Sequence, residues 1–100
     1  TARLTGMFPD PVRVELERLD GRWRQLPLDQ ALRALPGVHA FVQHLADEVA
    51  AASGMPSAPV PDLGPAVVVD QVRVMVFDML KAGRPEGLAD RLAALRRQLS

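Results

Sequence analysis

The chain contains no cysteine and no tyrosine, and it has one lysine and two histidines among its 100 residues. Without cysteine there can be no disulfides, no thiol nucleophiles and none of the usual structural zinc sites. The scarcity of lysine, histidine and tyrosine also leaves few side chains for acid–base or nucleophilic chemistry. We therefore predict that the protein is not an enzyme and that it holds no cofactor and no metal.

The sequence also lacks an excess of charge of one sign and a long hydrophobic run. Twelve basic residues balance twelve acidic ones, whereas proteins dedicated to nucleic acid usually carry a basic excess. No uninterrupted apolar run approaches the roughly 18 residues of a membrane helix, and no segment has the pattern of a targeting signal. These absences predict a cytoplasmic protein that does not bind a membrane. They also make nucleic acid an alternative partner and not the main one.

Apolar residues are plentiful, at 48% of the chain. That content is sufficient for a packed core, and the length predicts one domain over residues 1–100. Residues 54–65, GMPSAPVPDLGP, contain four prolines, which favours a stiff and partly extended connection. We expect this connection to lie inside the single domain and not at a domain boundary.

Residues 12–19, VRVELERL, alternate between apolar and charged side chains at first, which is typical of a half-buried strand. The pair Asp20-Gly21 favours a hairpin turn, with RWRQLPL as the returning strand. We therefore predict an α+β fold, with an N-terminal β-hairpin packed on three to four helices. A third short strand that includes Leu4, Met7 and Phe8 is an optional addition.

Two registers of this hairpin place Trp23 on different faces. A two-residue turn at Asp20-Gly21 puts Trp23 on the same face as Val14. A three-residue loop with a bulge at Gly21 pairs Val14 with Leu26 and turns Trp23 to the opposite face. The better apolar match favours the second register, so Trp23 is a candidate contact residue for a partner.

Two further helices are predicted between residues 29 and 52. Asp29 is a suitable N-cap for the first, and Pro36-Gly37 should end it, because proline lacks an amide donor and clashes with the preceding turn. The second, over residues 38–52, carries an apolar stripe at helical spacing and ends before Gly54.

The last third of the chain predicts two more helices. Residues 65–82 are rich in valine, but their polar residues gather on one side only at helical spacing, and Gly83 is suited to end the helix. Residues 85–99 form the final helix, with leucines recurring at intervals of four, three and four. This leucine seam is too short for a coiled coil, and it is our second candidate protein interface: Leu88, Leu92, Leu95 and Leu99.

Arginines near the hairpin and the C-terminus offer an alternative surface. Arginine beside an aromatic ring suits phosphate and base contacts, although interspersed carboxylates leave only a small positive excess in each segment. The candidate nucleic-acid contacts are Arg18, Arg22, Arg24, Arg96 and Arg97.

Other polar groups give weaker indications. His44 has the helical spacing to share an ion with Asp47 or Glu48, but such sets arise by chance on polar helix faces. A small-ligand domain or enzyme would have to use Asp70, Arg73 and Asp78. The two carboxylates lie two turns apart on one helix, too far to act as one acid–base pair.

The apolar surface therefore carries the functional prediction. Elements that expose more apolar area than one copy can bury are expected to associate. We predict a small non-catalytic protein-interaction or self-association module, forming a homodimer or binding another protein. A regulatory nucleic-acid-binding protein is the first alternative, and a ligand-binding domain or enzyme is the second.

Overall fold

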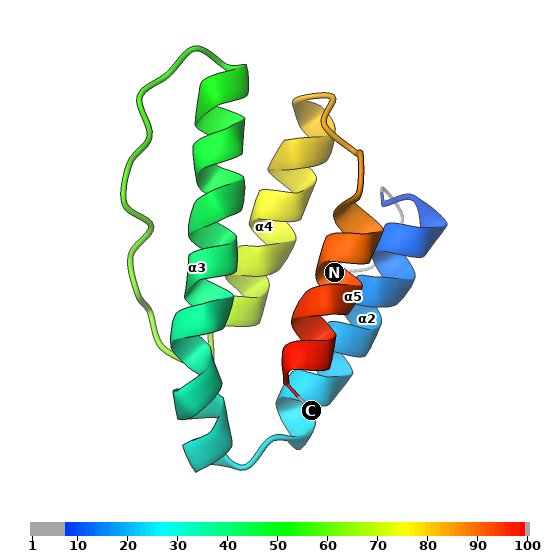
Figure 1. The fold of residues 1–100 in the computed structure, drawn as a ribbon, viewed down its shortest axis with the longest axis vertical. Helices are drawn as coiled ribbons and strands as arrows, with labels where there is room; N and C mark the ends of the chain where they lie inside the picture. Colours follow the sequence, from blue (N-terminus) through cyan, green and yellow to red (C-terminus); the bar gives the residue numbers. More distant parts are fainter. Residues whose placement is uncertain (1–7, 100) are drawn as a thin grey trace.

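Four helices account for the regular structure of residues 8–99, which are the residues that this computed structural model describes. They are α2 (Asp10–Gln25), α3 (Leu28–Ala52), α4 (Val68–Lys81) and α5 (Leu88–Gln98). Helix α3 lies beside α4 and α2 lies beside α5, and each of these pairs runs parallel (Figure 1). The long segment between α3 and α4 returns the chain along the bundle, which makes the parallel pairing of α3 and α4 possible.

The predicted α+β fold with a β-hairpin is wrong, because residues 8–99 contain no strand. Residues 12–28, which were expected to form the hairpin, belong to α2, a short connection and the start of α3. Pro27 is therefore a residue that precedes a helix and not part of an edge strand. Of the optional third strand, Leu4 and Met7 lie outside the described residues, whereas Phe8 is buried in the core and belongs to no strand.

Helix α2 forms because its apolar residues follow a helical spacing over most of its length. The alternation that is typical of a strand covers only a shorter part of the same segment. Its buried side chains follow intervals of four, three and four: Val12, Leu16, Leu19 and Trp23. Gly21 lies on the exposed side of α2 and does not have a positive φ, so it makes no turn here. Charged pairs one turn apart, such as Arg13 with Glu17 at 3.1 Å, add modest support to the exposed face.

Helix α3 runs through Pro36, so the prediction of two helices separated at Pro36-Gly37 is also wrong. Pro36 has no amide hydrogen to donate to the carbonyl of Leu32, four residues earlier. Both residues are exposed. That carbonyl can be solvated, while Leu35 and Val38 are buried in one core on either side. Burial of the flanking turns thus outweighs the local cost of proline. Asp29, the predicted N-cap, lies in the first turn.

The two C-terminal helices confirm the sequence interpretation. Valine-rich α4 buries Val68, Val72 and Val76, and the predicted stop at Gly83 adopts a left-handed φ of 72°. The stop after α3 is confirmed in the same way by Gly54, with a φ of 67°. Helix α5 buries Leu88, Leu92 and Leu95 of the leucine seam against the rest of the bundle, and Leu99, directly after the helix, is buried as well.

The proline-rich segment between α3 and α4, residues 53–67, is termed the strap. It has no helix or strand of its own and runs alongside α3 (Figure 1). Gln43 of α3 holds its backbone twice, donating to Ala58 O at 3.0 Å and accepting from Val60 N at 2.8 Å. His39 Nε2 donates to Val60 O, and Gln71 Nε2 of α4 donates to Pro61 O. The predicted extended connection is therefore fixed to the helices on both sides of it.

Candidate functional site

The predicted protein-interface residues lie inside the bundle. Leu88 and Leu92 are completely buried, and Leu95 and Leu99 are 4% and 8% exposed. Trp23 is 9% exposed. In this conformation the side chains of the leucine seam and of Trp23 are covered by the chain's own helices, and they offer little surface to a partner.

Trp23 instead makes a polar contact within the molecule. Its indole Nε1 donates to the carbonyl oxygen of Pro65 at 2.8 Å, which fixes the end of the strap to α2. Neither predicted hairpin register describes this position, because Trp23 lies on the buried side of a helix.

The candidate nucleic-acid arginines lie on α2 and α5, and most of them are engaged with the chain itself. Arg18 and Arg96 both pair with Glu15, at 2.9 and 3.4 Å. Arg24 pairs with Asp20 at 3.2 Å. Arg22 donates to the backbone carbonyl of Leu99, and exposed Arg97 makes no ion pair with another described residue. The carboxylates among these arginines reduce the positive potential that a phosphate would meet.

The candidate ligand residues of α4 do not form one polar site. Arg73 pairs with Asp70 at 2.8 Å, as expected from their spacing, and it also reaches Asp20 of α2 at 3.1 Å. Asp78 lies two turns further along α4 than Asp70 and takes no part in this pairing. Arg73 therefore acts as a link between two helices.

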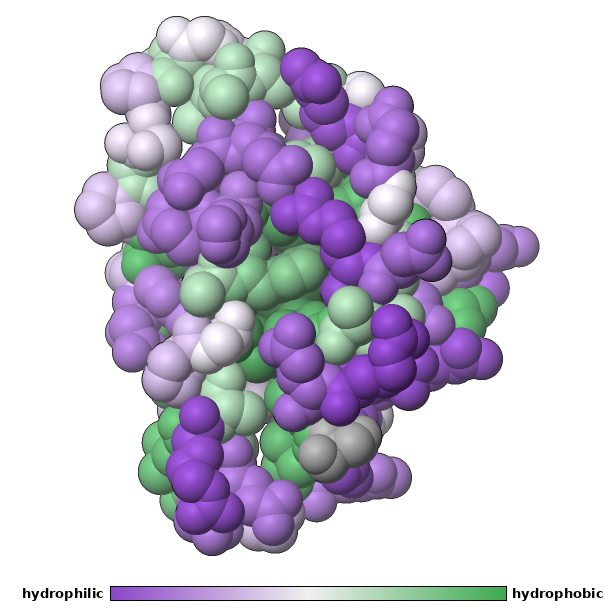
Figure 2. Space-filling model, viewed as in Figure 1, coloured by the Kyte–Doolittle hydropathy of each residue, from purple (hydrophilic) through white to green (hydrophobic). Residues whose placement is uncertain are grey.

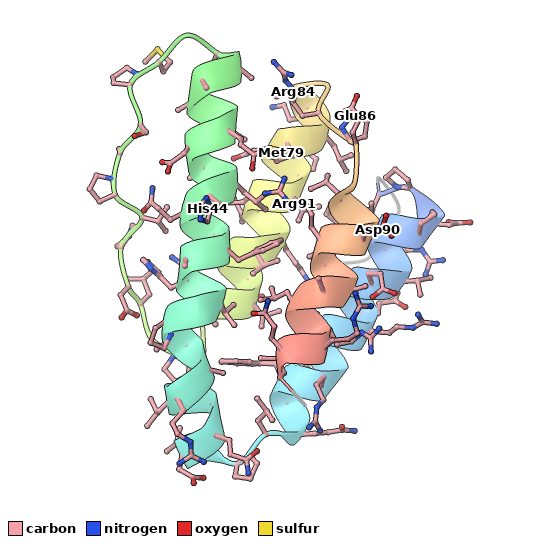
Figure 3. The ribbon with its side chains drawn as sticks, in the orientation of Figure 1. His44, Met79, Arg84, Glu86, Asp90 and Arg91 are labelled. Atoms are coloured by element: carbon pink, nitrogen blue, oxygen red, sulfur yellow. The ribbon has the colours of Figure 1, made fainter. Side chains whose placement is uncertain are left out.

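A groove runs between α3 and α5, where the bundle is more open than along its paired helices. Its wider part, about 300 Å³, is lined by His44, Arg91 and Phe41 among others. Arg91 extends from α5 toward α3 (Figure 3), pairs with Glu48 through two nitrogens at 2.6 and 3.2 Å, and lies over the Phe41 ring. Figure 2 shows hydrophobic residues at the bottom of this hollow within a mainly hydrophilic face. The groove is shallow, and its arginine is already occupied by Glu48.

A second pocket, of about 300 Å³, lies on the strap side of the molecule. Its walls are mainly apolar and come from α3, the strap and α4, with Val42, Val60 and Met75 among them. Gln71 and Asp70 also line it, and Asp70 is paired with Arg73. The pocket could receive an apolar side chain, but it holds no free charge to orient a polar ligand.

The clearest exposed apolar side chains are two leucines at the start of α3. Leu28 is 67% exposed and Leu32 is 50% exposed, and they are one helical turn apart. Figure 1 shows that this end of α3 extends past the start of α4. Among residues 8–99, three other large apolar side chains are exposed, on the strap or on α4: Met55, Leu63 and Val74.

The leucine pair continues a side of α3 that the strap covers further along. Leu28 and His39 are eleven residues apart, as are Leu32 and Gln43. At about 100° per residue this places each pair within about 20° around the helix. The strap is bound to His39 and Gln43, so it covers the middle of this side and leaves the first turns open. We term Leu28 and Leu32, with their neighbours Asp29 and Arg33, the α3 patch.

The sequence interpretation missed this patch because it placed Leu28 in a strand. The signal that could have revealed it is the four-residue spacing of Leu28 and Leu32 beside an Asp-Arg pair with the same spacing. Leu32 lies about 100° around α3 from buried Ala31, whereas Leu28 lies within about 20° of buried Leu35 and is exposed because it lies at the end of the helix.

Within residues 8–99, no group of three or more histidine, aspartate or glutamate side chains is arranged to hold a metal ion. None of the four described helices is both long enough and apolar enough to cross a membrane.

Comparisons with protein-family models, with curated proteins and with solved structures found no match to this chain.

Proposed function

We propose that this protein is a small non-catalytic module that self-associates, and that the α3 patch is its contact surface. The observation that carries the proposal is the exposure of Leu28 and Leu32 one turn apart at the start of α3. Large contiguous apolar patches mark binding surfaces on soluble proteins, and these two leucines form a small patch of that kind, which suits a weak contact.

The bundle does not require these leucines for its own stability. Its core is formed by the buried apolar residues of all four helices, and neither Leu28 nor Leu32 belongs to it. Charged residues at these two positions would keep helix propensity, and an acidic residue in the first turn would complement the helix dipole. Leucine at both positions is therefore explained better by a contact than by folding.

The size of the patch predicts a weak association. Burying one leucine completely contributes about 1.5–3 kcal/mol, and these side chains are already partly covered. Four leucines, two from each copy, would contribute about 3.5–7 kcal/mol before the cost of association is subtracted. Even the upper value without that cost corresponds to a dissociation constant of about 10 µM, so the loss of translational and rotational freedom places the constant toward the millimolar end. We therefore expect a monomer in dilute solution and a dimer at high concentration.

Sedimentation velocity over protein concentrations from about 10 µM to 1 mM tests the proposal. The wild-type protein should shift from monomer to dimer across this range. Leu32→Glu should remain monomeric, because it places two carboxylates in the contact. Val74→Glu is the matched control, since Val74 is also a helical side chain that is 50% exposed. It should associate like the wild type.

Two results would contradict the proposal. One is a monomer at every concentration. The other is equal association of Leu32→Glu and Val74→Glu, whether both variants lose it or neither does, which would place the contact elsewhere or make it non-specific. Circular dichroism of each variant shows whether the fold is intact.

A further inference from the structure

We propose that two copies pair through the α3 patch with their α3 helices antiparallel, so that Asp29 of each copy meets Arg33 of the other. This inference rests on the proposed self-association and adds its geometry and its charge pairing. It follows from the placement of four residues in the first two turns of α3.

The patch consists of an apolar pair flanked by an opposite-charge pair with the same spacing. Leu28 and Leu32 are four residues apart, and so are Asp29 and Arg33. At about 100° per residue, both charged residues lie on the same flank of the leucine pair. On the other flank, Ala31 is buried in the chain's own core, as is Leu35 two turns further along, nearly in line with Leu28. Only the charged flank is therefore free to meet a second copy.

A two-fold axis brings like surfaces together in reversed order. We place the two-fold axis between the two α3 helices, at the level midway between residues 30 and 31. Measured along the helix axis, Leu28 of one copy is then within about 1.5 Å of the height of Leu32 of the other. The same holds for Asp29 and Arg33. In an antiparallel pair the same flank of each helix faces the other, so the charges meet with opposite sign. A parallel pair would bring the charged flank against the flank that is buried in the bundle.

The charges are available for this exchange. Within one chain, Asp29 and Arg33 form an ion pair at 3.4 Å, and each side chain is 70% exposed. Such an exposed pair one turn apart contributes little to helix stability. Each group can therefore turn to the second copy at small cost, and burial beside four leucines would reduce the screening of the new pairs.

Charge reversal tests the geometry in the full-length protein. Asp29→Arg makes the flank wholly basic and Arg33→Asp makes it wholly acidic, so each variant alone should dimerise about tenfold more weakly than the wild type at low salt. Mixing the two variants should restore association as a heterodimer, because every cross-pair is then attractive. Native mass spectrometry identifies this species by its mass. The double variant Asp29→Arg/Arg33→Asp should dimerise with itself like the wild type.

The outcomes separate this inference from the proposed function. Wild-type association that Leu32→Glu abolishes, with no heterodimer in the mixture of charge variants, overturns the antiparallel geometry and leaves self-association standing. The same conclusion follows if both single variants dimerise like the wild type at low salt. A monomeric wild type at all concentrations overturns both. Thermal unfolding of each variant confirms that the helices remain folded, so that a loss of association reflects the contact alone.

Discussion

Trp23 of α2 donates a hydrogen bond of 2.8 Å to the carbonyl oxygen of Pro65, 42 residues further along the chain. This bond joins the end of α2 to the end of the strap, just before α4 begins. Trp23 is also 9% exposed and belongs to the core. One side chain thus closes the bundle at the end where the strap arrives.

Replacing Trp23 by phenylalanine should destabilise the fold. The variant removes the donor to Pro65 O and part of a buried ring, so the free energy of unfolding should fall by about 1–3 kcal/mol. Urea unfolding followed by circular dichroism measures the change. Leu63→Ala, at an exposed strap position, is the control and should change it by less than about 0.5 kcal/mol. Equal effects of the two variants would show that Trp23 has no special part in closing the bundle.

Gly21→Ala distinguishes the helix at residues 10–25 from a hairpin. In α2 a Cβ at Gly21 would meet no atom within 4 Å, and alanine is the better helix former. The free energy of unfolding should therefore rise by about 0.5–1 kcal/mol. A hairpin turn that needs glycine at this position would be destabilised instead. Thermal unfolding gives the sign of the change, and a lower midpoint would contradict the helix.

Gln43→Leu should loosen the strap and leave the bundle folded. The variant loses the amide that donates to Ala58 O and accepts from Val60 N. Because each of the two lost bonds costs about 1 kcal/mol, hydrogen exchange at the Val60 amide should accelerate by up to about thirtyfold. The amides in the middle of α4 serve as the internal control. Unchanged exchange at Val60 would show that other contacts hold the strap.

The two halves of the chain should reassemble after separation. Helix α3 packs chiefly on α4 and α2 packs on α5, so each half has its main contacts in the other. Peptides covering residues 1–57 and 58–100 should be weakly helical alone and more helical when mixed, as circular dichroism can show. A second mixture carrying Leu92→Asp, at a completely buried position, should gain no helicity. If each peptide is fully helical alone, the halves do not depend on each other.

The C-terminal helices could be predicted from sequence because their patterns are long and have one period. In residues 65–82 only a helical spacing separates the polar residues from the apolar ones, and the left-handed glycine at Gly83 marks the end. The leucine seam of α5 was also correctly placed on one helix face. Its burial, however, depends on α2, which the sequence interpretation had assigned to strands.

The N-terminal half was mispredicted because two periods overlap there. Val12, Val14 and Leu16 satisfy a strand alternation, whereas Val12, Leu16 and Leu19 satisfy a helix. The helical set continues to Trp23 and is the buried one. Asp20-Gly21 and Pro36 then added local signals for a turn and a break, which packing outweighed. Local propensity could not reveal this, since the deciding contacts come from α4 and α5.

The α3 patch could not be located until α3 was known to begin at Leu28. As part of a strand, Leu28 was expected to face the apolar side of a hairpin. As the first residue of α3, it is 67% exposed. The contact surface therefore depends on a single change of secondary structure at residues 26–28.

Sedimentation velocity of the wild-type protein beside Leu32→Glu, from about 10 µM to 1 mM, is the most direct measurement of the central claim. Self-association through the α3 patch predicts that the wild type moves from monomer to dimer while Leu32→Glu stays monomeric with its helices intact. A wild type that remains monomeric throughout, or a Leu32→Glu variant that dimerises equally well, would contradict it.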